Sequence, residues 1–400
     1  MTRAAVLLLA LAAFARADVA QFDAGLDPKE GAVYSADGYH YTSFESSGGQ
    51  DRWLVDGRPR VQLPEGSLPS ATPALSADGS MLLHYLQVFD KQGNPLGLAA
   101  AVNGRAVGPL YQEIQSLKLS PRGGNIAYVA RTPAGWVVVS RQGAGPAFAE
   151  APVILGVAEN GIVYLAPGAG GTWLYRNHKA LGRADYESAA VSEDLRRIAG
   201  VVPTTGGVFV DIDGKRTGPW ASASAPAFSP NGRHAAFLAE KLPASGGSYN
   251  ALIIDGHPAP MKVCGGCTLT IDDAGRAFED KLLVALDPRG EMHQLFLDGK
   301  ELGRPPRVGF ASGGSHYVYP MMTGRGVGVG LDGRFIEQGA PLPILASSIP
   351  IAFDGTDEYH YWSLVGDRLR LVCGAVDGNG GNTRCAQLGK TLYKPVPAGE

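Results

Sequence analysis

The stretch Phe228-Ser229-Pro230-Asn231-Gly232-Arg233-His234-Ala235-Ala236-Phe237-Leu238 decides the fold. It reads as the end of one strand, a Ser-Pro-Asn-Gly turn and the beginning of a second strand. Asn followed by Gly tolerates the positive φ that a tight hairpin demands, and a Ser side chain hydrogen-bonds the local backbone. The stretch therefore predicts a β-hairpin, and its copies elsewhere in the chain predict the architecture.

Similar turns recur along the chain at intervals of about 34 to 44 residues. This spacing is close to the roughly 40–50 residues of a four-stranded propeller blade. The clearest copies are Ser35-Ala36-Asp37-Gly38, Ser76-Ala77-Asp78-Gly79, Ser120-Pro121-Arg122-Gly123 and Ser229-Pro230-Asn231-Gly232. Weaker copies are Ala158-Glu159-Asn160-Gly161, Ser192-Glu193-Asp194, Asp272-Asp273-Ala274-Gly275, Ser312-Gly313-Gly314 and Phe353-Asp354-Gly355.

A second kind of turn alternates with the first. It follows an apolar strand and usually reads Asp-Gly or Asn-Gly, often with a basic residue after it. Its copies are Asp56-Gly57, Asn103-Gly104, Asp213-Gly214, Asp255-Gly256, Asp298-Gly299 and Asp332-Gly333, with degraded forms at Arg141-Gln142-Gly143 and Arg176-Asn177. Two hairpin turns in each repeat leave room for four short strands, which is one blade.

These patterns predict an all-β chain that forms a single β-propeller of about eight four-stranded blades. Nine turns of the first kind favour nine blades, whereas the eight turns of the second kind favour eight, and seven is the lower limit. Pairing of strands from the two ends of the chain would close the ring and remove the last exposed sheet edge. The alternative is a β-sandwich, in which the regular alternation of the two turns would be a coincidence.

An aromatic residue recurs at nearly the same place in the second strand of most repeats. Its copies are Tyr41, Tyr85, Tyr128, Tyr164, Phe237, Tyr319 and Tyr361. Aromatic side chains supply large apolar area where neighbouring blades bury their faces. We therefore expect these residues to pack between blades, rather than to form a ligand cage.

Residues 1–17 have the features of a signal peptide. Arg3 gives a basic start, residues 4–14 form a short apolar run, and Ala15-Arg16-Ala17 is a small-x-small cleavage site. The run is too short for a permanent transmembrane helix. We therefore expect an exported protein, periplasmic or secreted, with a propeller domain over residues 18–400; an uncleaved anchor is the alternative.

The composition is that of a loop-rich globular β protein. Hydrophobic residues make up 45% of the chain and charged residues 18%, with 55 Gly and 28 Pro. The formal net charge is −3, so the chain has neither the basic footprint of a nucleic-acid-binding protein nor a polybasic membrane patch. We predict a monomer that neither binds nucleic acid nor inserts stably into a membrane.

The turn at Ser229, with the basic and small-aromatic residues that follow it, resembles the TolB-like or WD40-like (PD40) propeller repeat. The Ser120 copy, continued by Ala127-Tyr128, matches next best. The resemblance extends over most of the mature chain and is strong at about four copies. It implies a propeller in the bacterial envelope that serves as an interaction scaffold.

The four cysteines form two local pairs, Cys264 with Cys267 and Cys373 with Cys385. In an oxidising compartment such pairs predict disulfides. The second pair would staple a hairpin whose tip is the glycine-rich run from Asp377 to Asn382. A redox-active Cys264-x-x-Cys267 motif and a joint four-cysteine zinc site are the alternatives. The glycine-rich run also resembles a calcium loop, although it lacks the Glu at the twelfth position.

Four histidines share second-strand positions and are each followed by Tyr: His40, His84, His316 and His360. If their strands point the same way, the side chains could gather near the propeller axis and bind a metal or sense pH. The more ordinary expectation is that neighbouring residues satisfy each of them. We assign no catalytic, cofactor-binding or metal-binding residue and no cofactor.

The sequence thus favours an exported scaffold that binds a protein or a glycan at one face. No Gly-x-Ser-x-Gly nucleophile motif is present. The alternative is a lactonase- or lyase-like enzyme whose site lies at the central channel. That enzyme would need carboxylates or histidines from three or four blades to converge around the axis.

Overall fold

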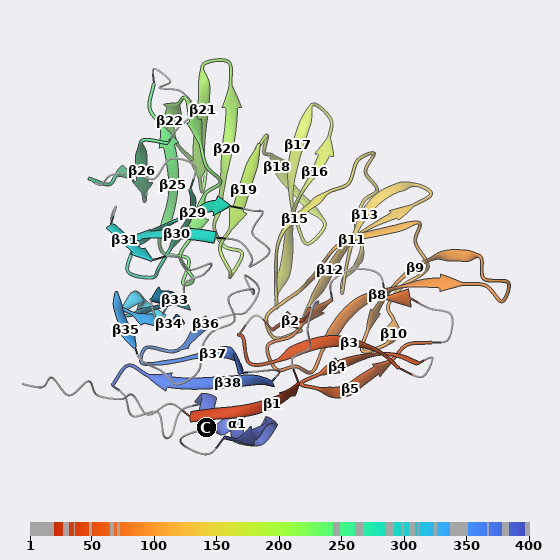
Figure 1. The fold of residues 1–400 in the computed structure, drawn as a ribbon. Coiled ribbons are helices and arrows are strands. Elements are labelled where there is room, and N and C mark those ends of the chain that lie inside the picture. Colours follow the sequence, from red (N-terminus) through yellow and green to blue (C-terminus); the bar gives the residue numbers. More distant parts are fainter. Residues whose placement is uncertain are drawn as a thin grey trace, which may run out of the picture.

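The computed structural model describes residues 20–26, 32–35, 37–47, 50–64, 68–69, 73–242, 249–260, 267–284, 292–297, 300–303, 309–310, 312–323, 326–336, 351–365, 368–377 and 384–396. The described strands form nine antiparallel sheets. Figure 1 shows these sheets following one another around a central region as the blades of a β-propeller. The predicted signal peptide lies outside the described residues.

The blades are numbered 1 to 9 in chain order. Blades 1 to 3 contain β2 (Val33–Tyr34), β3 (Tyr41–Ser47), β4 (Gln50–Val55) and β5 (Arg58–Gln62); β6 (Leu68–Pro69), β7 (Ala74–Leu75), β8 (Leu82–Phe89), β9 (Pro95–Val102) and β10 (Arg105–Ala106); and β11 (Glu113–Leu119), β12 (Ile126–Thr132), β13 (Gly135–Ser140) and β14 (Gly143–Ala144). Blades 4 and 5 contain β15 (Val153–Ala158), β16 (Gly161–Gly168), β17 (Gly171–Arg176) and β18 (Lys179–Arg183); and β19 (Ser188–Val191), β20 (Ile198–Thr204), β21 (Gly207–Ile212) and β22 (Lys215–Trp220).

The remaining blades complete the ring. Blades 6 to 8 contain β23 (Ser222–Ala223), β24 (Ala227–Phe228), β25 (Ala235–Glu240), β26 (Ala251–Ile254) and β27 (His257–Pro258); β28 (Thr268–Ile271), β29 (Ala277–Val284), β30 (Met292–Leu297) and β31 (Lys300–Gly303); and β32 (Gly309–Phe310), a 3-10 turn (Ser312–Gly314), β33 (Tyr317–Thr323), β34 (Gly326–Leu331) and β35 (Arg334–Ile336). Blade 9 contains β36 (Ile351–Asp354), β37 (Glu358–Val365), β38 (Arg368–Ala375), β1 (Ala20–Leu26) and β39 (Lys394–Pro395), with α1 (Arg384–Leu392) before β39.

The difference between eight and nine predicted blades has a simple structural cause. Each of the nine blades has a turn of the first kind between its first two strands, so that count gives the number of blades. Blade 9 has no turn of the second kind, because its fourth strand is β1 from the other end of the chain. The ring therefore has one blade more than the preferred count of eight, within the predicted range.

Apolar cores lie between successive blades and hold the ring together. Leu82 and Trp53 belong to the core between blades 1 and 2, and Tyr128 and Leu83 to the core between blades 2 and 3. The predicted role of the recurring aromatics is confirmed, since Tyr41, Tyr128, Tyr164, Phe237, Tyr319 and Tyr361 are all buried and Tyr85 packs against the core between blades 2 and 3.

The first turn of each blade explains the repeated Ser-x-Asp-Gly sequence. In blade 2 the Ser76 hydroxyl donates to Asp78 Oδ1 at 2.6 Å and accepts the Met81 N–H at 2.9 Å. Gly79 has a φ of 64°, a conformation that costs Gly little. A Cβ at Gly79 would also lie 2.7 Å from Nδ1 of His40 in blade 1. The glycine thus serves both the turn and the contact between blades.

The second turn is tied to the first through one side chain. In blade 6, Asp255 and Gly256 have φ values of 50° and 82°, as a tight hairpin turn requires. Asp255 Oδ1 accepts the first N–H of β25, from Ala235, at 2.9 Å. An equivalent bond to the first or second residue of the second strand recurs in blades 1, 2, 4, 5 and 8, where the acceptors are Asp56, Asn103, Asn177, Asp213 and Asp332.

The chain also contains a helix that the sequence did not predict, α1. Within the described residues, no helix combines the length and the hydrophobicity that crossing a membrane requires.

The first strands of neighbouring blades, such as β11 and β15 or β15 and β19, contact each other. They therefore surround the centre of the ring, and the later strands of each blade lie farther out.

His84 leads to a prediction about pH. It lies 6.3 Å from Trp53, ring to ring, in the core between blades 1 and 2, and neither ring nitrogen has a hydrogen-bond partner among the described residues. Burial lowers its pKa from 6.5 to about 4. The unfolded chain therefore binds a proton at this histidine at a higher pH than the folded protein does. As a result, the contribution of neutral His84 to the free energy of unfolding is complete above pH 6.5 and is lost as the pH falls toward 4.

We expect His84→Leu to remove this loss, which amounts to on the order of 3 kcal/mol of unfolding free energy at pH 4. Urea unfolding of both proteins at pH 7 and pH 4.5 measures the effect. The exposed His257 in β27 provides the control variant His257→Leu. An unchanged pH dependence in His84→Leu would contradict the assignment.

Candidate functional site

A group of polar side chains is connected by hydrogen bonds where blade 9 meets blade 1. β1 pairs with β38 on one side, from Ala20 opposite Cys373 to Leu26 opposite Arg368, and with β39 on its other side. The amino-terminal strand is therefore held between two strands from the carboxyl-terminal part of the chain. Figure 1 shows β1 beside β38, with α1 next to it.

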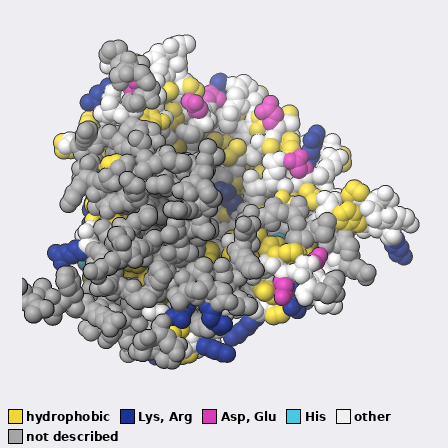
Figure 2. All heavy atoms as spheres, viewed as in Figure 1, with side chains coloured by type: hydrophobic (Ala, Val, Ile, Leu, Met, Phe, Trp, Pro, Cys, Tyr) yellow, Lys and Arg dark blue, Asp and Glu magenta, His cyan; other side chains and the backbone are white. Residues whose placement is uncertain are grey.

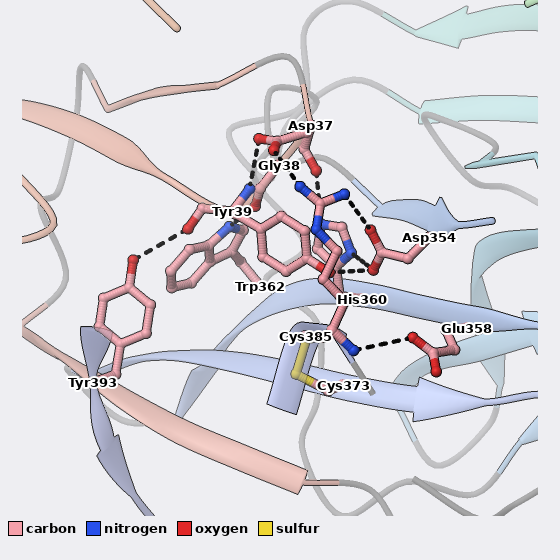
Figure 3. Close-up of a disulfide and its surroundings, with 11 residues drawn as sticks. Asp37, Gly38, Tyr39, Asp354, Glu358, His360, Trp362, Cys373, Cys385 and Tyr393 are labelled. Atoms are coloured by element: carbon pink, nitrogen blue, oxygen red, sulfur yellow. Dashed lines mark hydrogen bonds and ion pairs between the residues drawn. A yellow bond between two sulfur atoms is a disulfide. The ribbon is translucent and has the colours of Figure 1, made fainter. Parts of the chain in front are cut away.

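A disulfide joins Cys373 in β38 to Cys385 in α1 (Figure 3). The structure thus contains the predicted pair, but Cys385 lies in a helix and not in the return strand of a hairpin. The prediction of a stapled hairpin is wrong for this reason. Both cysteines are buried with Phe22 and Tyr393 in the core between blades 9 and 1. The bond therefore fixes α1 at the interface where these two blades meet and the ring closes, which we call the joint.

Arg384, the first residue of α1, extends over the joint. Its guanidinium lies 5.4 Å from the centre of the Tyr39 ring and within 4.0 Å of carboxylate oxygens of Asp37 and Asp354. The His360 ring also stacks on the Tyr39 ring, with 3.9 Å between the two ring centres. Figure 3 shows the side chains of Asp37 and Tyr39 from blade 1 converging with those of Asp354 and His360 from blade 9.

Each of these polar groups has a partner. The Tyr39 hydroxyl donates to Asp354, and burial together with this carboxylate raises the pKa of Tyr39, so the hydroxyl keeps its proton. His360 Nδ1 lies 2.9 Å from Asp354, and its Nε2 lies 2.8 Å from the Asp37 carbonyl oxygen. Trp362 Nε1 donates to the Gly38 carbonyl at 2.6 Å.

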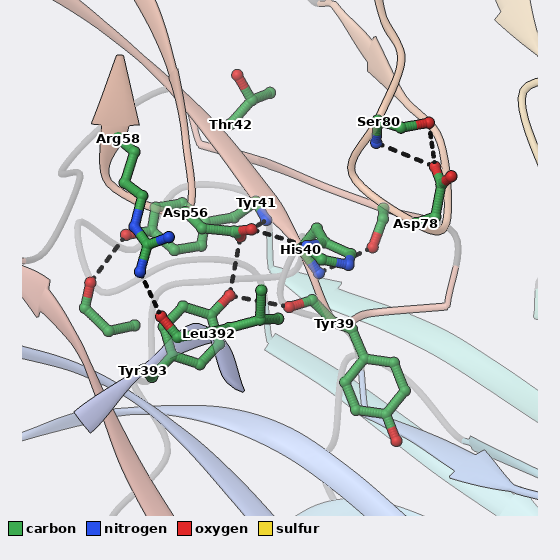
Figure 4. Close-up of polar contacts among 12 residues, drawn as sticks. Tyr39, His40, Tyr41, Thr42, Asp56, Arg58, Asp78, Ser80, Leu392 and Tyr393 are labelled. Carbon is green, nitrogen blue, oxygen red and sulfur yellow. Dashed lines mark hydrogen bonds and ion pairs between the residues drawn. The ribbon is translucent and has the colours of Figure 1, made fainter. Parts of the chain in front are cut away.

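A second polar group at the joint surrounds Tyr393 (Figure 4). The Tyr393 hydroxyl donates to Asp56 Oδ1 at 2.8 Å and lies 3.1 Å from the Tyr39 carbonyl oxygen. His40 Nδ1 lies 2.7 Å from the other Asp56 oxygen. Burial disfavours protonated His40, but the hydrogen bond and charge of Asp56 outweigh it, and the pKa of His40 is raised. These bonds connect β39 and α1 to blade 1. The polar groups of the joint therefore help to hold the ring closed.

The four histidines that the sequence placed at equivalent positions do not come together. His40 and His316 precede the second strands of their blades and bond to Asp56 and Asp332 of the same blade. His84 and His360 are buried at two different blade interfaces. Among the described residues, no group of three or more His, Cys, Asp or Glu is placed to hold a metal ion.

Two other sequence features lie partly outside the described residues. Cys264 is one, so the bond between Cys264 and Cys267 remains a prediction. The glycine-rich run is the other, because only Asp377 of it is described. The calcium-loop alternative therefore also remains a prediction.

The two faces of the ring are built differently. One face, the turn face, carries the first and second kinds of turn described above. Its turns bond to each other across blades: the Ala77 N–H donates to the Pro121 carbonyl at 2.8 Å, and the Asn231 N–H donates to Asp273 at 2.8 Å. Arg276 Nη2 donates to the Gly314 carbonyl at 2.7 Å. These polar groups of the turn face are thus bonded to a neighbouring blade.

The opposite face, the hairpin face, carries the turns between second and third strands and the links between blades. Large hydrophobic side chains that the sequence pattern did not single out lie exposed there. They are Leu96 (56% exposed), Leu110 (47%), Val153 (59%) and Leu242 (48%). The available signal was an apolar residue beside a turn, as in Pro95-Leu96 and Pro109-Leu110. Figure 2 shows hydrophobic side chains at the surface along the protruding β8–β9 hairpin.

Removal of the disulfide tests the role of α1. We expect Cys373→Ala/Cys385→Ala to lower the free energy of unfolding by about 3 kcal/mol, because the bond restricts the unfolded chain by closing a loop between cysteines that are 12 positions apart. Urea unfolding, with and without dithiothreitol, measures this change. If the double variant is as stable as the wild type, α1 does not secure the joint. Any effect of dithiothreitol on the double variant reports on Cys264 and Cys267.

Tyr393→Phe tests the polar part of the joint. The substitution keeps the ring in the core but removes the hydroxyl that binds Asp56 and the Tyr39 carbonyl. We expect a loss of about 1.5–3 kcal/mol, as for a buried hydrogen bond to a charged group. The control is Tyr249→Phe, since the Tyr249 hydroxyl has no hydrogen-bond partner within the described residues. Equal thermal stability of the two variants would show that the Tyr393 hydroxyl does not stabilise the joint.

No family model and no curated protein matches the chain. Among solved structures, the chain is similar to a eukaryotic initiation factor at 12% identity, with 71% of this chain and 96% of that chain covered and a TM-score of 0.40. The dihydro-heme d1 dehydrogenase NirN matches at 16% identity, with 76% and 71% covered and a TM-score of 0.36. TolB from Acinetobacter baumannii matches at 16% identity, with 61% and 64% covered and a TM-score of 0.26. At these low identities and scores, the propeller assignment rests on the nine sheets and their ring closure.

Proposed function

We propose that this chain is an exported β-propeller scaffold that binds a protein or a glycan through its hairpin face. The observation that carries the proposal is the set of exposed hydrophobic side chains on that face. Of the large hydrophobic residues that are exposed in the described part of the chain, Leu96, Leu110, Val153 and Leu242 lie there, and Phe44 and Leu181 lie within strands elsewhere. Leu96 and Leu110 are the neighbouring pair of this set, because the strand that carries Leu96 bonds to the link that carries Leu110. Adjacent exposed apolar residues favour a binding surface.

The structure of blade 2 supports a preorganised surface. Leu98 in β9 and Tyr111 in the link to blade 3 exchange two backbone hydrogen bonds of 2.8 Å. A Cβ added at Gly97 would lie 3.4 Å from the Leu110 Cβ and 2.8 Å from the Tyr111 carbonyl oxygen. The link is therefore fixed against the hairpin that carries Leu96. Rigid loops lose little conformational entropy when they bind a partner.

Export is proposed from two features. The first is the signal-peptide pattern of residues 1–17. The second is the disulfide between Cys373 and Cys385, a bond that persists in oxidising compartments such as the periplasm or the extracellular medium. The proposal takes the mature chain as a monomer that needs no cofactor and binds no nucleic acid, in line with its small net charge.

Site-specific photo-crosslinking in the producing cell tests the hairpin face. A photoreactive residue at Leu96 or Leu110 should give a defined adduct, whereas the same residue at Leu181, which is 53% exposed on β18, should give none. Mass spectrometry identifies a protein adduct, and a glycan array with the purified chain covers the other ligand class.

The double variant Leu96→Asp/Leu110→Asp should then bind the identified partner about ten-fold more weakly or worse, because each leucine loses its apolar contact area. The matched variant Leu181→Asp should keep its affinity. Equal binding by both variants, or equal adducts at all three positions, would refute the assignment of this face.

A further inference from the structure

Lys118 occupies an unusual place in the ring. It belongs to β11, the first strand of blade 3, which contacts the first strand of blade 4, β15, at the centre of the molecule. Among the first strands that the structure describes, Lys118 is the only basic residue. The other charged residues on these strands are Glu113 and Asp354.

The backbone before Lys118 is irregular. Gln115 pairs with Val129 and Lys118 pairs with Ala127, so β11 contains one residue more than its partner strand over this interval. Ser116, inside this bulge, has a φ of 53°, which is uncommon for a residue other than Gly. The facing strand β15 has a similar shift between Ile154 and Gly156. Bulges of this kind redirect side chains and are frequent beside binding sites.

The register shows which way the Lys118 side chain faces. Residues paired across an antiparallel ladder lie on the same side of the sheet. Ala127 and Val129 are buried in the core between blades 3 and 4, so Lys118 and Gln115 face blade 4. On that side, β15 contributes Ile154 and Val157 to the same core. The Lys118 stem therefore runs along apolar surface at the inner edge of this interface.

The Lys118 amine has no polar partner among the described residues. Burial alone lowers its pKa, with no contribution from a neighbouring carboxylate. Two cations of the turn face are paired, by contrast: Arg197 lies 2.8 Å from Asp213 and Arg276 lies 2.6 Å from Asp272. A partly buried cation without a counter-charge is unfavourable unless a ligand supplies one.

We propose that Lys118 is the cationic anchor of a binding site for a small anionic ligand, at the inner wall between blades 3 and 4. The ligand carries a carboxylate or a phosphate group, which accepts a charge-assisted hydrogen bond from the amine. The site is separate from the hairpin face, because Lys118 lies at the end of β11 that leads into the Ser120 turn. It therefore goes beyond the proposed scaffold function.

Isotope-edited NMR of the lysine side chains tests this proposal on the purified mature chain. Reductive methylation with 13C-formaldehyde labels the amines and keeps their charge, and Lys118→Gln assigns the Lys118 signal. The probes are inorganic phosphate and citrate, each titrated at constant ionic strength with sodium chloride as balance. Lys179, exposed at the start of β18, is the control residue.

We expect a saturable shift of the Lys118 signal and a rise of its pKa, while the Lys179 signal stays unchanged. By calorimetry, Lys118→Gln should bind the effective anion about ten-fold more weakly or worse, whereas Lys179→Gln and Leu96→Asp/Leu110→Asp should bind it as the wild type does. Response to phosphate alone assigns a phosphate ligand, response to citrate alone a carboxylate ligand, and response to both a general anion site.

The proposal is overturned if neither anion shifts Lys118 more than Lys179, or if Lys118→Gln keeps the wild-type affinity. Lys118→Met provides a second neutral variant that retains the apolar stem. Circular dichroism of both variants establishes that they are folded. Failure of this site leaves the hairpin-face proposal intact, because the Leu96 and Leu110 experiments do not depend on it.

Discussion

The pairing of β1 with β38 is the interaction on which the rest of the structure depends. Eight blades are each formed by one continuous segment of chain, but blade 9 obtains its fourth strand from the other end. A propeller whose last blade lacked that strand would expose an open sheet edge, where unpaired backbone groups invite association. Pairing the chain ends removes this edge and makes the stability of every blade interface depend on closure.

The joint shows how such a long-range contact is secured. Residues more than 300 positions apart, such as Tyr39 and Asp354 or Gly38 and Trp362, are bonded directly. Bringing them together carries a loop-closure cost that grows slowly with chain length. The disulfide, the packing of α1, and the hydrogen bonds of Tyr393 all stabilise the same interface between blades 9 and 1, which offsets that cost.

The two faces of the ring have separate roles. On the turn face, short Ser, Asp, Asn and Gly side chains satisfy the backbone, and successive blades bond to one another. On the hairpin face, loops differ from blade to blade and leucines remain exposed. Binding residues are commonly placed on loops held by a rigid scaffold, and the proposed hairpin-face site has that arrangement. The proposed anion site differs, because Lys118 belongs to a strand of the rigid inner wall.

The local sequence was sufficient to predict the all-β fold, the repeating turns and the buried aromatics. These features depend on interactions within about ten residues or on a simple alternation along one strand, as in the turn from Ser229 to His234. The number of blades was harder to predict, because no turn in the sequence connects β1 to β38, the strand with which it pairs. The helix α1 was missed because it is short and packs through only a few buried residues.

The sequence by itself determined the unit of this protein, a four-stranded blade with two kinds of turn. Only the tertiary structure decided what the units do together. It kept the four histidines apart and placed Cys385 in a helix that is bonded to Cys373. It also left Leu96 and Leu110 exposed, and the Lys118 amine without a polar partner among the described residues. The reason is physical: turns and strands follow from neighbouring residues, whereas exposure and charge pairing depend on blades that are distant in the sequence.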